Sequence, residues 1–328
     1  MVETPVLFIT FVRSGYARQT WEGIKAAKPK TLYFYSNKGR AEKEGEIERN
    51  EEIRSYIQEV DWACDVHTWF RDESVDIYSS LKGAISWLFE NEGQGIIIEE
   101  DCVPTKAFFS FCDQMIAQYK DNKKVWCISG DNYLNYLPKN ADYFFSHYHF
   151  MFGWASWRDR WEQIPWGNVP LRQLMDSDLE LFYKSKREAA YRRKELKRCE
   201  RLVQEKDCWD YAWGALIDIN NGVTVHPKEH LVTSVGLMGT HSKIAKKTMF
   251  HISANPSDDT YIIKKHPAVI DADYEYDHEF FKKFEVHMRL YNRLYRRLYA
   301  KVKGYSILNP ERPSHAEHLN KLLKKILS

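Results

Sequence analysis

The chain has 328 residues, of which 44% are hydrophobic, and its 48 Lys and Arg nearly balance its 46 Asp and Glu. A formal net charge of +2 is far from the strongly basic balance of a general nucleic-acid binder, and we expect no nucleic-acid partner. The hydrophobic fraction excludes a largely disordered chain, and the length suits one or two domains.

Six cysteines form no CxxC pair and no zinc-type spacing, which is typical of reduced thiols. The first residues lack the pattern of a signal peptide, and no window approaches ~20 consecutive apolar residues. We therefore expect a cytoplasmic protein that is either soluble or peripheral on the inner face of the membrane.

Short apolar runs alternate with segments of helical period through the first 130 residues. Strands are expected at 6–11, 31–35, 63–67, 96–99 and 125–129. Between them, apolar residues recur every three or four positions at 16–26, 47–57 and 77–89. Helical crossovers make successive strands parallel, so this order predicts an α/β fold with a mixed, mostly parallel sheet flanked by helices.

The apolar run at 95–98 leads directly into Glu99, Glu100 and Asp101. Three carboxylates at the end of a buried strand repel one another and resist desolvation, so water, a basic partner or a divalent cation must compensate them. An all-oxygen cluster suits Mg2+ or Mn2+, which fill their remaining positions with water and substrate phosphates. In an extended chain, Glu99 and Asp101 point to one side and Glu100 to the other.

A structural role is the alternative for these acids: they would cap the helix expected at 107–119, or pair with Arg13 or Lys82. Ligands collect at the carboxyl ends of parallel strands. Arg13, Asn37 and Asp131, which follow predicted strands, are therefore expected to converge with the acids on one crevice.

Residues 144–166 are rich in aromatic side chains around a single glycine, Gly153. Aromatic walls commonly bind the faces of sugars, whereas the general tendency of such rings is to fill a core. We interpret most of these rings as core and predict that Gly153 and Trp154 are the exception, in contact with the bound sugar.

A helix is expected to begin at Trp209 and Asp210. Large rings flank Asp210, and shielding by them raises the pKa of a carboxylate, so Asp210 is a candidate general base. The alternative is that it complements the helix dipole. The glycine-punctuated stretch 236–242 predicts a mobile loop that closes over a donor, with His241 reaching the metal or the diphosphate; an ordinary surface turn is the alternative.

Two further segments are strongly basic. Residues 179–204 predict a solvated helix, with contact to anionic lipid or acceptor as the alternative. After Tyr274 the chain is basic and aromatic, and residues 251–328 are predicted to form a helical extension beyond a main domain at 1–250. This extension either contacts an anionic membrane or packs back on the main domain.

The order of Glu99-Glu100-Asp101, Phe152-Gly153-Trp154, Trp209-Asp210 and the stretch 236–241 resembles glycosyltransferases of the GT-A fold. The resemblance is closest to the N-acetylglucosaminyltransferase I type and its bacterial relatives, and it covers residues 6–242. It implies a GT-A (Rossmann-like) domain in which Asp101 binds a Mn2+ ion that bridges the diphosphate of a UDP-sugar. Glu99 and Glu100 would face the donor, and Asp210 would act as the base.

By the same resemblance, Arg13 matches a nucleotide or phosphate contact. We also expect Lys82 to contact the donor. The chain departs from the family pattern in three places. Glu100 stands where Asp is common, Asn37 stands where an acid near the uracil is common, and Tyr211 stands where some members have a second acid.

The implied reaction is a metal-dependent, inverting transfer from a nucleotide sugar to a glycan or a lipid-linked saccharide. Two alternatives stay open. One is a nucleotidyltransferase acting on sugar phosphates, although its glycine-rich loop would be reduced here to Gly15. The other is a non-catalytic carbohydrate-binding protein.

Overall fold

A computed structural model describes residues 1–164, 166, 179–204, 209–236 and 252–287 of the chain. The chain divides into two compact units. The first comprises Met1–Gly236 and Lys247–Asp277, and it contains the main sheet. The second comprises Leu237–Lys246 and His278–Ser328, of which residues 278–287 are described. In that described part, the rings of Phe280 and Phe284 stack with centroids 4.3 Å apart.

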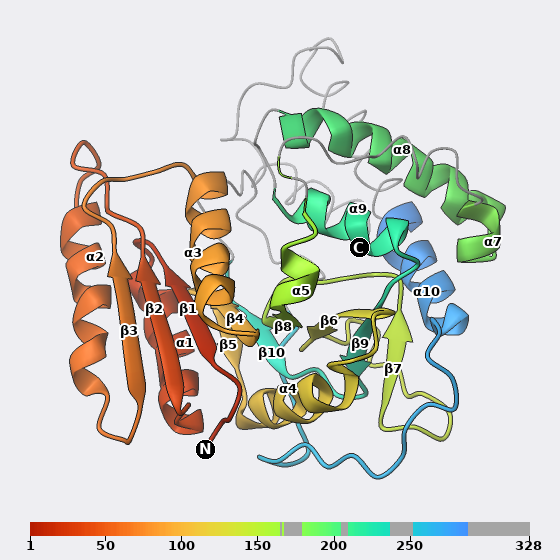
Figure 1. The fold of residues 1–328 in the computed structure, drawn as a ribbon, viewed down its shortest axis with the longest axis horizontal. Helices are drawn as coiled ribbons and strands as arrows, with labels where there is room; N and C mark the ends of the chain where they lie inside the picture. Colours follow the sequence, from red (N-terminus) through yellow and green to blue (C-terminus); the bar gives the residue numbers. More distant parts are fainter. Residues whose placement is uncertain (165, 167–178, 205–208, 237–251, 288–328) are drawn as a thin grey trace, which may run out of the picture. The chain divides into compact units, whose positions relative to one another are not determined.

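The strands and helices follow the alternating order that the apolar pattern predicts (Figure 1). The strands are β1 (Val6–Thr10), β2 (Thr31–Ser36), β3 (Asp65–Phe70), β4 (Gln94–Glu99), β5 (Cys102–Pro104), β6 (Val125–Ser129), β7 (Tyr143–Ser146), β8 (Trp154–Trp157), β9 (Val223–Pro227) and β10 (Val232–Ser234). The helices are α1 (Ser14–Ala27), α2 (Glu46–Ser55), η1 (Tyr56–Glu59), α3 (Ile77–Asn91), α4 (Lys106–Tyr119), α5 (Arg158–Trp161), α7 (Leu179–Tyr183), α8 (Lys186–Gln204), α9 (Asp210–Ile219), α10 (Tyr274–Phe280) and η2 (Phe281–His287).

The main sheet has eight strands in the order β3-β2-β1-β4-β8-β6-β9-β7. Strands β1 to β4 are mutually parallel, and β6 runs parallel to β9. β8 lies antiparallel between β4 and β6, and β7 is antiparallel to β9. The prediction of an α/β fold with a mixed, mostly parallel sheet flanked by helices is confirmed.

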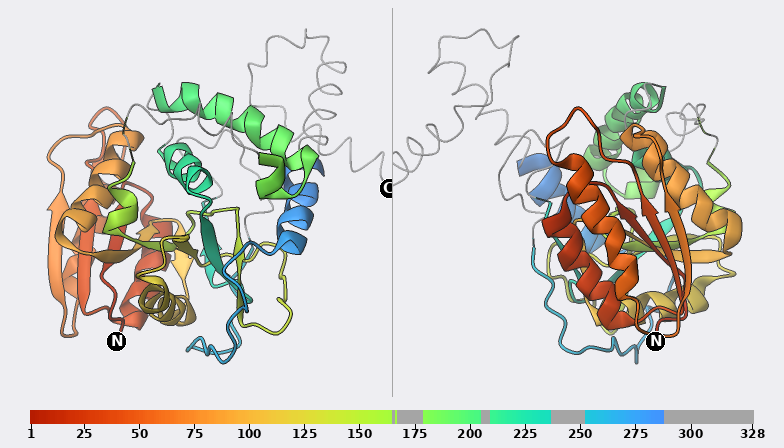
Figure 2. Two further views of the ribbon diagram at one scale, coloured as in Figure 1. Left: turned by 45° about the vertical axis from the view of Figure 1, so that its right-hand side comes forward. Right: turned by 90° about the vertical axis from the view of Figure 1, so that its left-hand side faces the viewer.

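Helices cover both faces of this sheet. Successive strand residues point to opposite faces, and the apolar side chains on each face pack against helices. Side chains such as Phe8 and Ile98 pack with α1, α2 and α4, whereas Leu7 and Ile97 pack with α3, α5 and α9. Figure 2 shows α1 and α2 on one side of β1 to β3, and α3 on the other. The carboxyl ends of β1, β2, β4 and β6 therefore meet at one edge of a sheet that is closed on both faces.

A second, two-stranded sheet pairs β5 antiparallel with β10. β5 directly follows the three acids, and its register places Ser234 opposite Cys102. This pairing brings Val235 and Gly236, which follow β10, against the turn that carries the acids.

The helix ends of α3 and α4 are fixed by side-chain caps. Asp76 accepts a hydrogen bond from the backbone N–H of Ser79 (2.9 Å), and Thr105 accepts one from that of Phe108 (3.2 Å). An acceptor at this position satisfies a donor that the first helical turn leaves unpaired. The alternative in which the three acids cap α4 is therefore not what the structure shows, since Thr105 caps it.

The strongly charged segment is helical, as predicted, and forms α7 and α8. Most of the basic and aromatic tail lies outside the described residues, so its membrane contact stays a prediction. Among the described helices, none is both long and apolar enough to cross a membrane.

Candidate active site

Arg13 links two of the three acids at the end of β4. It follows β1, and its Nε donates to Glu100 Oε1 (2.6 Å) while its Nη1 donates to Asp101 Oδ2 (2.7 Å). The other Glu100 oxygen accepts the backbone N–H of Phe11 (2.7 Å). The side chain of Glu100 is only 4% exposed, so breaking this pair would leave a buried charge at a cost of about 3–5 kcal/mol.

The pKa values around this pair follow from burial and from charge. Burial raises the pKa of Glu100, and Arg13 opposes that rise. Burial alone would lower the pKa of Arg13, but the carboxylates of Asp101 and Glu100 raise it above its usual value. One alternative predicted from the sequence was that a basic residue compensates the acids. Arg13 does so for Glu100 and Asp101.

Asp101 lies in a tight turn between β4 and β5. Its side chain keeps 19% of its surface exposed, and its backbone carbonyl accepts the N–H of Val235 (2.9 Å). A Cβ atom placed on Gly236 would lie 2.1 Å from Asp101 Oδ2. Only a glycine therefore leaves the space beside this carboxylate open.

Glu99 is half-buried on the other side of the chain from Glu100. Burial and the nearby charges of Asp101, Asp210 and Glu100 raise its pKa to about 8, although Arg13 lowers it. Asp210, at the start of α9, is one of the charges that act on Glu99. The sequence predicted the segments of Glu99 and Asp210 as parts of one site, and that site stays a prediction.

Asp210 is the first residue of α9 and follows the buried Trp209. Asp210 is exposed at the surface, and the protein atoms packed around the start of α9 raise its pKa by excluding part of the surrounding water. The backbone N–H groups of Asp210 and Tyr211, at the start of the helix, offset only part of this rise. A raised pKa is what a carboxylate needs to accept a proton near neutral pH.

Asn37 directly follows β2, as predicted. Both the nitrogen and the oxygen of its side-chain amide form hydrogen bonds with backbone groups. Its Nδ2 donates to Val75 O (2.9 Å), and its Oδ1 accepts the N–H groups of Val75 (3.1 Å) and Lys38 (3.0 Å). Asn37 is 4% exposed. It therefore anchors the loop that precedes α3, and contact with a nucleobase stays a prediction.

Asn50, on α2, connects the ends of β1 and β2 through hydrogen bonds, a role that was not predicted from its sequence context. Its Nδ2 donates to Phe11 O (2.6 Å) and Asn37 O (2.8 Å). One feature of the sequence points to this role: Asn50 is a polar, uncharged residue three positions before Ile53, so both lie on the same face of a highly charged helix.

Lys82 lies on α3, with its Nζ 4.5 Å from the centroid of the Trp166 ring. Its role in donor binding stays a prediction.

Gly153 and Trp154 lie at the start of β8. Gly153 has φ +88°, and a Cβ there would lie 2.9 Å from a methyl group of Val232, so a glycine is needed at this turn. Trp154 is 1% exposed and packs with other indoles. Most of the aromatic segment is core, as predicted, and Trp154 belongs to that core.

Asp131, which follows β6, is fully buried and does not open onto a crevice. Its Oδ2 accepts from Ser129 (3.2 Å), and its Oδ1 lies 4.0 Å from His230 Nε2. Burial raises its pKa well above the usual range. The expected convergence therefore holds for Arg13 with Glu100 and Asp101, whereas Asp131 lies in the interior.

His241 lies outside the described residues, as does most of the glycine-punctuated stretch. Within the described ranges, no group of three or more His, Cys, Asp or Glu side chains is arranged to hold a metal. A Mg2+ or Mn2+ site does not require such a group, because these ions commonly use one or two carboxylates with water and phosphate oxygens.

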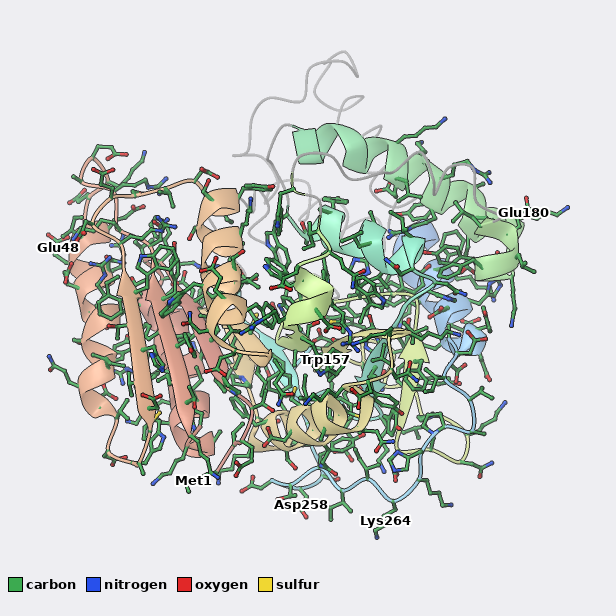
Figure 3. All side chains as sticks on the ribbon, in the orientation of Figure 1. Met1, Glu48, Trp157, Glu180, Asp258 and Lys264 are labelled. Atoms are coloured by element: carbon green, nitrogen blue, oxygen red, sulfur yellow. The ribbon has the colours of Figure 1, made fainter. Side chains whose placement is uncertain are left out.

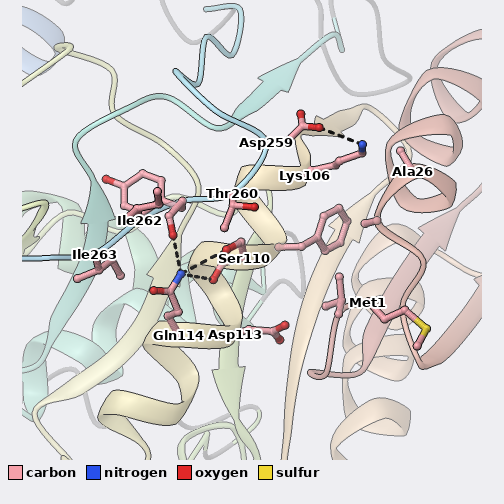
Figure 4. Close-up of a pocket in the computed structure, with 14 residues that line it drawn as sticks. Met1, Ala26, Lys106, Ser110, Asp113, Gln114, Asp259, Thr260, Ile262 and Ile263 are labelled. Carbon is pink, nitrogen blue, oxygen red and sulfur yellow. Dashed lines mark hydrogen bonds and ion pairs between the residues drawn. The ribbon is translucent and has the colours of Figure 1, made fainter.

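A groove of about 700 Å³ lies elsewhere on the first unit, between α4, the end of α1 and residues 259–263 (Figure 4). Lys106 and Asp259 form an ion pair at its rim (3.0 Å). None of the predicted site residues lines this groove.

The chain matches no protein-family model and no curated relative by sequence. Solved structures that it resembles include HddC from Yersinia pseudotuberculosis, at 8% identity over 49% of this chain and 80% of that one, with a TM-score of 0.29. A UDP-glucose pyrophosphorylase complexed with UDP-glucose matches at 8% identity over 49% of this chain and 78% of that one, with a TM-score of 0.29. An apo UDP-glucose pyrophosphorylase matches at 10% identity over 69% and 90%, with a TM-score of 0.32. At these scores the likeness does not indicate which reaction this chain catalyses.

Proposed function

We propose that the protein is a metal-dependent inverting glycosyltransferase that moves a sugar from a nucleotide-diphosphate donor, of the UDP-sugar class, to an acceptor hydroxyl. The observation that carries the proposal is the packing between the two segments: Trp154 pairs with Ile97 of β4, the strand that ends in Glu99, and its ring stacks on Trp209, the residue before Asp210. It supports a single site that contains both an acidic turn and a separate carboxylate with a raised pKa.

A Mn2+ or Mg2+ ion fits the acid turn. Asp101 supplies a partly exposed carboxylate, and Gly236 leaves open the space that a Cβ would fill beside Oδ2. Arg13 brings one positive charge to a turn of three acids. When bound, such an ion would supply Lewis-acid stabilisation of the charge on the leaving diphosphate. Asp101 would hold it, and His241 is the further ligand proposed from the sequence.

Three side chains would carry out the other steps of the transfer. Arg13 would orient the acid turn and offer a positive charge to the diphosphate, and Glu99 would face the donor sugar. Asp210 would take the proton from the acceptor hydroxyl as its oxygen attacks the anomeric carbon. One carbon–oxygen bond forms, the bond to the diphosphate breaks on the opposite side, and the anomeric configuration inverts.

The acceptor class proposed is a glycan or a lipid-linked saccharide. The alternative, a nucleotidyltransferase, corresponds by name to the UDP-glucose pyrophosphorylases among the neighbours. Only three residues separate β1 from α1, which leaves little room for a glycine-rich phosphate loop. That short connection favours the glycosyltransferase.

The test is a screen of UDP-, GDP- and CMP-sugars, with and without Mn2+, for release of the nucleotide. A glycosyltransferase is expected to release the nucleoside diphosphate slowly without an acceptor, and only when metal is present. Formation of UTP from UDP-glucose and pyrophosphate would establish the nucleotidyltransferase instead. Failure to turn over or bind any nucleotide sugar would leave a carbohydrate-binding protein and reject the proposal.

A further inference from the structure

Trp154 occupies the strand that joins the two halves of the main sheet. In β8 it pairs with Ile97 of β4 on one side and with Ser129 of β6 on the other. Its backbone is therefore held by two neighbouring strands, and its side chain is 1% exposed. A residue held in this way has little freedom to shift without disturbing the centre of the sheet.

The ring of Trp154 stacks on Trp209, the residue before Asp210. The two ring centroids are 5.8 Å apart, and the planes differ by 24°. Trp154 also lies 5.8 Å from the ring of Trp213, one turn further along α9. The first turn of α9 thus rests on the Trp154 ring.

Trp154 and Glu99 are connected through the same strand and the same face of the sheet. Ile97 is the β4 partner of Trp154, and its side chain packs with the Trp154 and Trp209 rings in one cluster. Glu99 follows Ile97 by two residues, so strand alternation directs both side chains to that face. The Trp154 ring therefore lies between the strand that ends in Glu99 and the helix that begins at Asp210.

We propose that Trp154 is a positioning residue whose ring holds Asp210 at its working distance from the acid turn. This inference rests on the proposed function, because it assigns Trp154 a part in the transfer reaction. It replaces the role predicted from the sequence, in which Trp154 contacts the sugar directly. A shift of about 1 Å in a reacting group can cost a factor of about 100 in rate, so a smaller side chain should lower kcat.

Trp157 provides a matched control. It lies in the same strand, is 2% exposed and has its side chain on the opposite face, in the cluster with α1 and α4. Its ring packs under the Arg160 guanidinium, 4.3 Å from the ring centroid, and Figure 3 shows it in the interior. Replacing Trp157 creates a cavity of similar size without touching Trp209.

The experiment compares Trp154→Leu, Trp154→Phe and Trp157→Leu with the native protein, using Mn2+ and the donor found in the screen. Trp154→Leu is expected to lower kcat by about 100-fold, with donor KM within about twofold of the native value. Trp154→Phe, which keeps a ring against Trp209, should recover much of this loss. Trp157→Leu should lower the melting temperature by a similar amount but leave kcat within about threefold.

Equal losses of kcat in Trp154→Leu and Trp157→Leu would overturn the positioning role while leaving the proposed function intact. A rise in donor KM at unchanged kcat would restore the direct sugar contact and also overturn it. If Trp154→Leu does not fold, the comparison rests on Trp154→Met and Trp157→Met, which also remove the ring, and equal kcat values for these two would reject the inference. A native protein that turns over no nucleotide sugar rejects both proposals.

Discussion

Burial raises the pKa of Glu99, at the end of β4, and the charges of Asp101 and of Asp210, at the start of α9, add to that rise. More than 100 residues separate Glu99 from Asp210 in the sequence. Two acids that interact in a partly buried site keep one of them protonated near neutral pH, unless a cation compensates their charge. This relationship supports one site for donor and acceptor.

Asp210→Asn tests the base. The amide cannot accept the hydroxyl proton, so kcat should fall by about 100- to 10,000-fold while donor KM changes little. Asn keeps the size of the side chain, and the melting temperature should stay close to native. Steady-state kinetics with a saturating acceptor give both parameters. Equal losses in donor affinity and turnover would make Asp210 a binding residue.

The pH dependence of kcat follows from the raised pKa of Asp210. The base works only when ionised, so activity should be lost as pH falls through a pKa above the 3.8 of an unperturbed aspartate. The profile should be measured at saturating donor and metal. An acid limb at or below pH 3.8 would contradict the assignment, as would an unchanged limb in the residual activity of Asp210→Asn.

Gly236→Ala tests the space beside Asp101. The new Cβ would lie 2.1 Å from Oδ2, so the carboxylate or the turn after β10 must move. We expect metal-stimulated turnover to fall by at least about tenfold. Gly93→Ala is the matched control, since a Cβ there meets no heavy atom within 4 Å. Native turnover in Gly236→Ala would show that the position of Asp101 does not matter.

The sequence predicted the mostly apolar runs that correspond to β1, β2, β4 and β6, and a further run at 63–67 that overlaps β3. It did not predict β8, because the aromatic run around Gly153 follows neither a strand nor a helix period. The insertion of β8 between β4 and β6 is a long-range pairing that local patterns do not specify.

In the candidate site, too, contacts that follow from the fold class were predictable, whereas contacts that depend on long-range strand pairing were not. Arg13 and the acids both follow parallel strands, so their meeting was predictable from the fold class. The contact between Gly236 and Asp101 depends on the pairing of β10 with β5, for which a three-residue strand gives no signal. The burial of Trp154 likewise follows from the position of β8.

Asp142→Asn tests how the segment that contains Lys264 and Lys265 is held within the first unit. Burial would raise the pKa of Asp142, but Lys228 (2.8 Å) and the N–H groups of Lys264 (2.8 Å) and Lys265 (2.9 Å) lower it to about 2. A lowered pKa stabilises the fold above the unfolded value of 3.8, and this stabilisation is lost as pH falls towards about 2.

The Asn variant should therefore lose about 2 kcal/mol of unfolding free energy at pH 7, and less as the pH approaches 3. Urea denaturation at several pH values measures the difference. Glu48→Gln, at an exposed acid, is the control and should stay within about 0.5 kcal/mol of native. A loss that does not depend on pH would mean that the charge of Asp142 is not responsible.

The most direct test of the proposed site is the release of nucleoside diphosphate from a nucleotide sugar by the native protein and by Asp101→Asn, each with and without Mn2+. Asp259→Asn, at an acid of the separate groove, controls for the loss of a charge. We predict Mn2+-stimulated release by the native protein and by Asp259→Asn, and none by a folded Asp101→Asn. Full metal-stimulated release by Asp101→Asn would contradict the account.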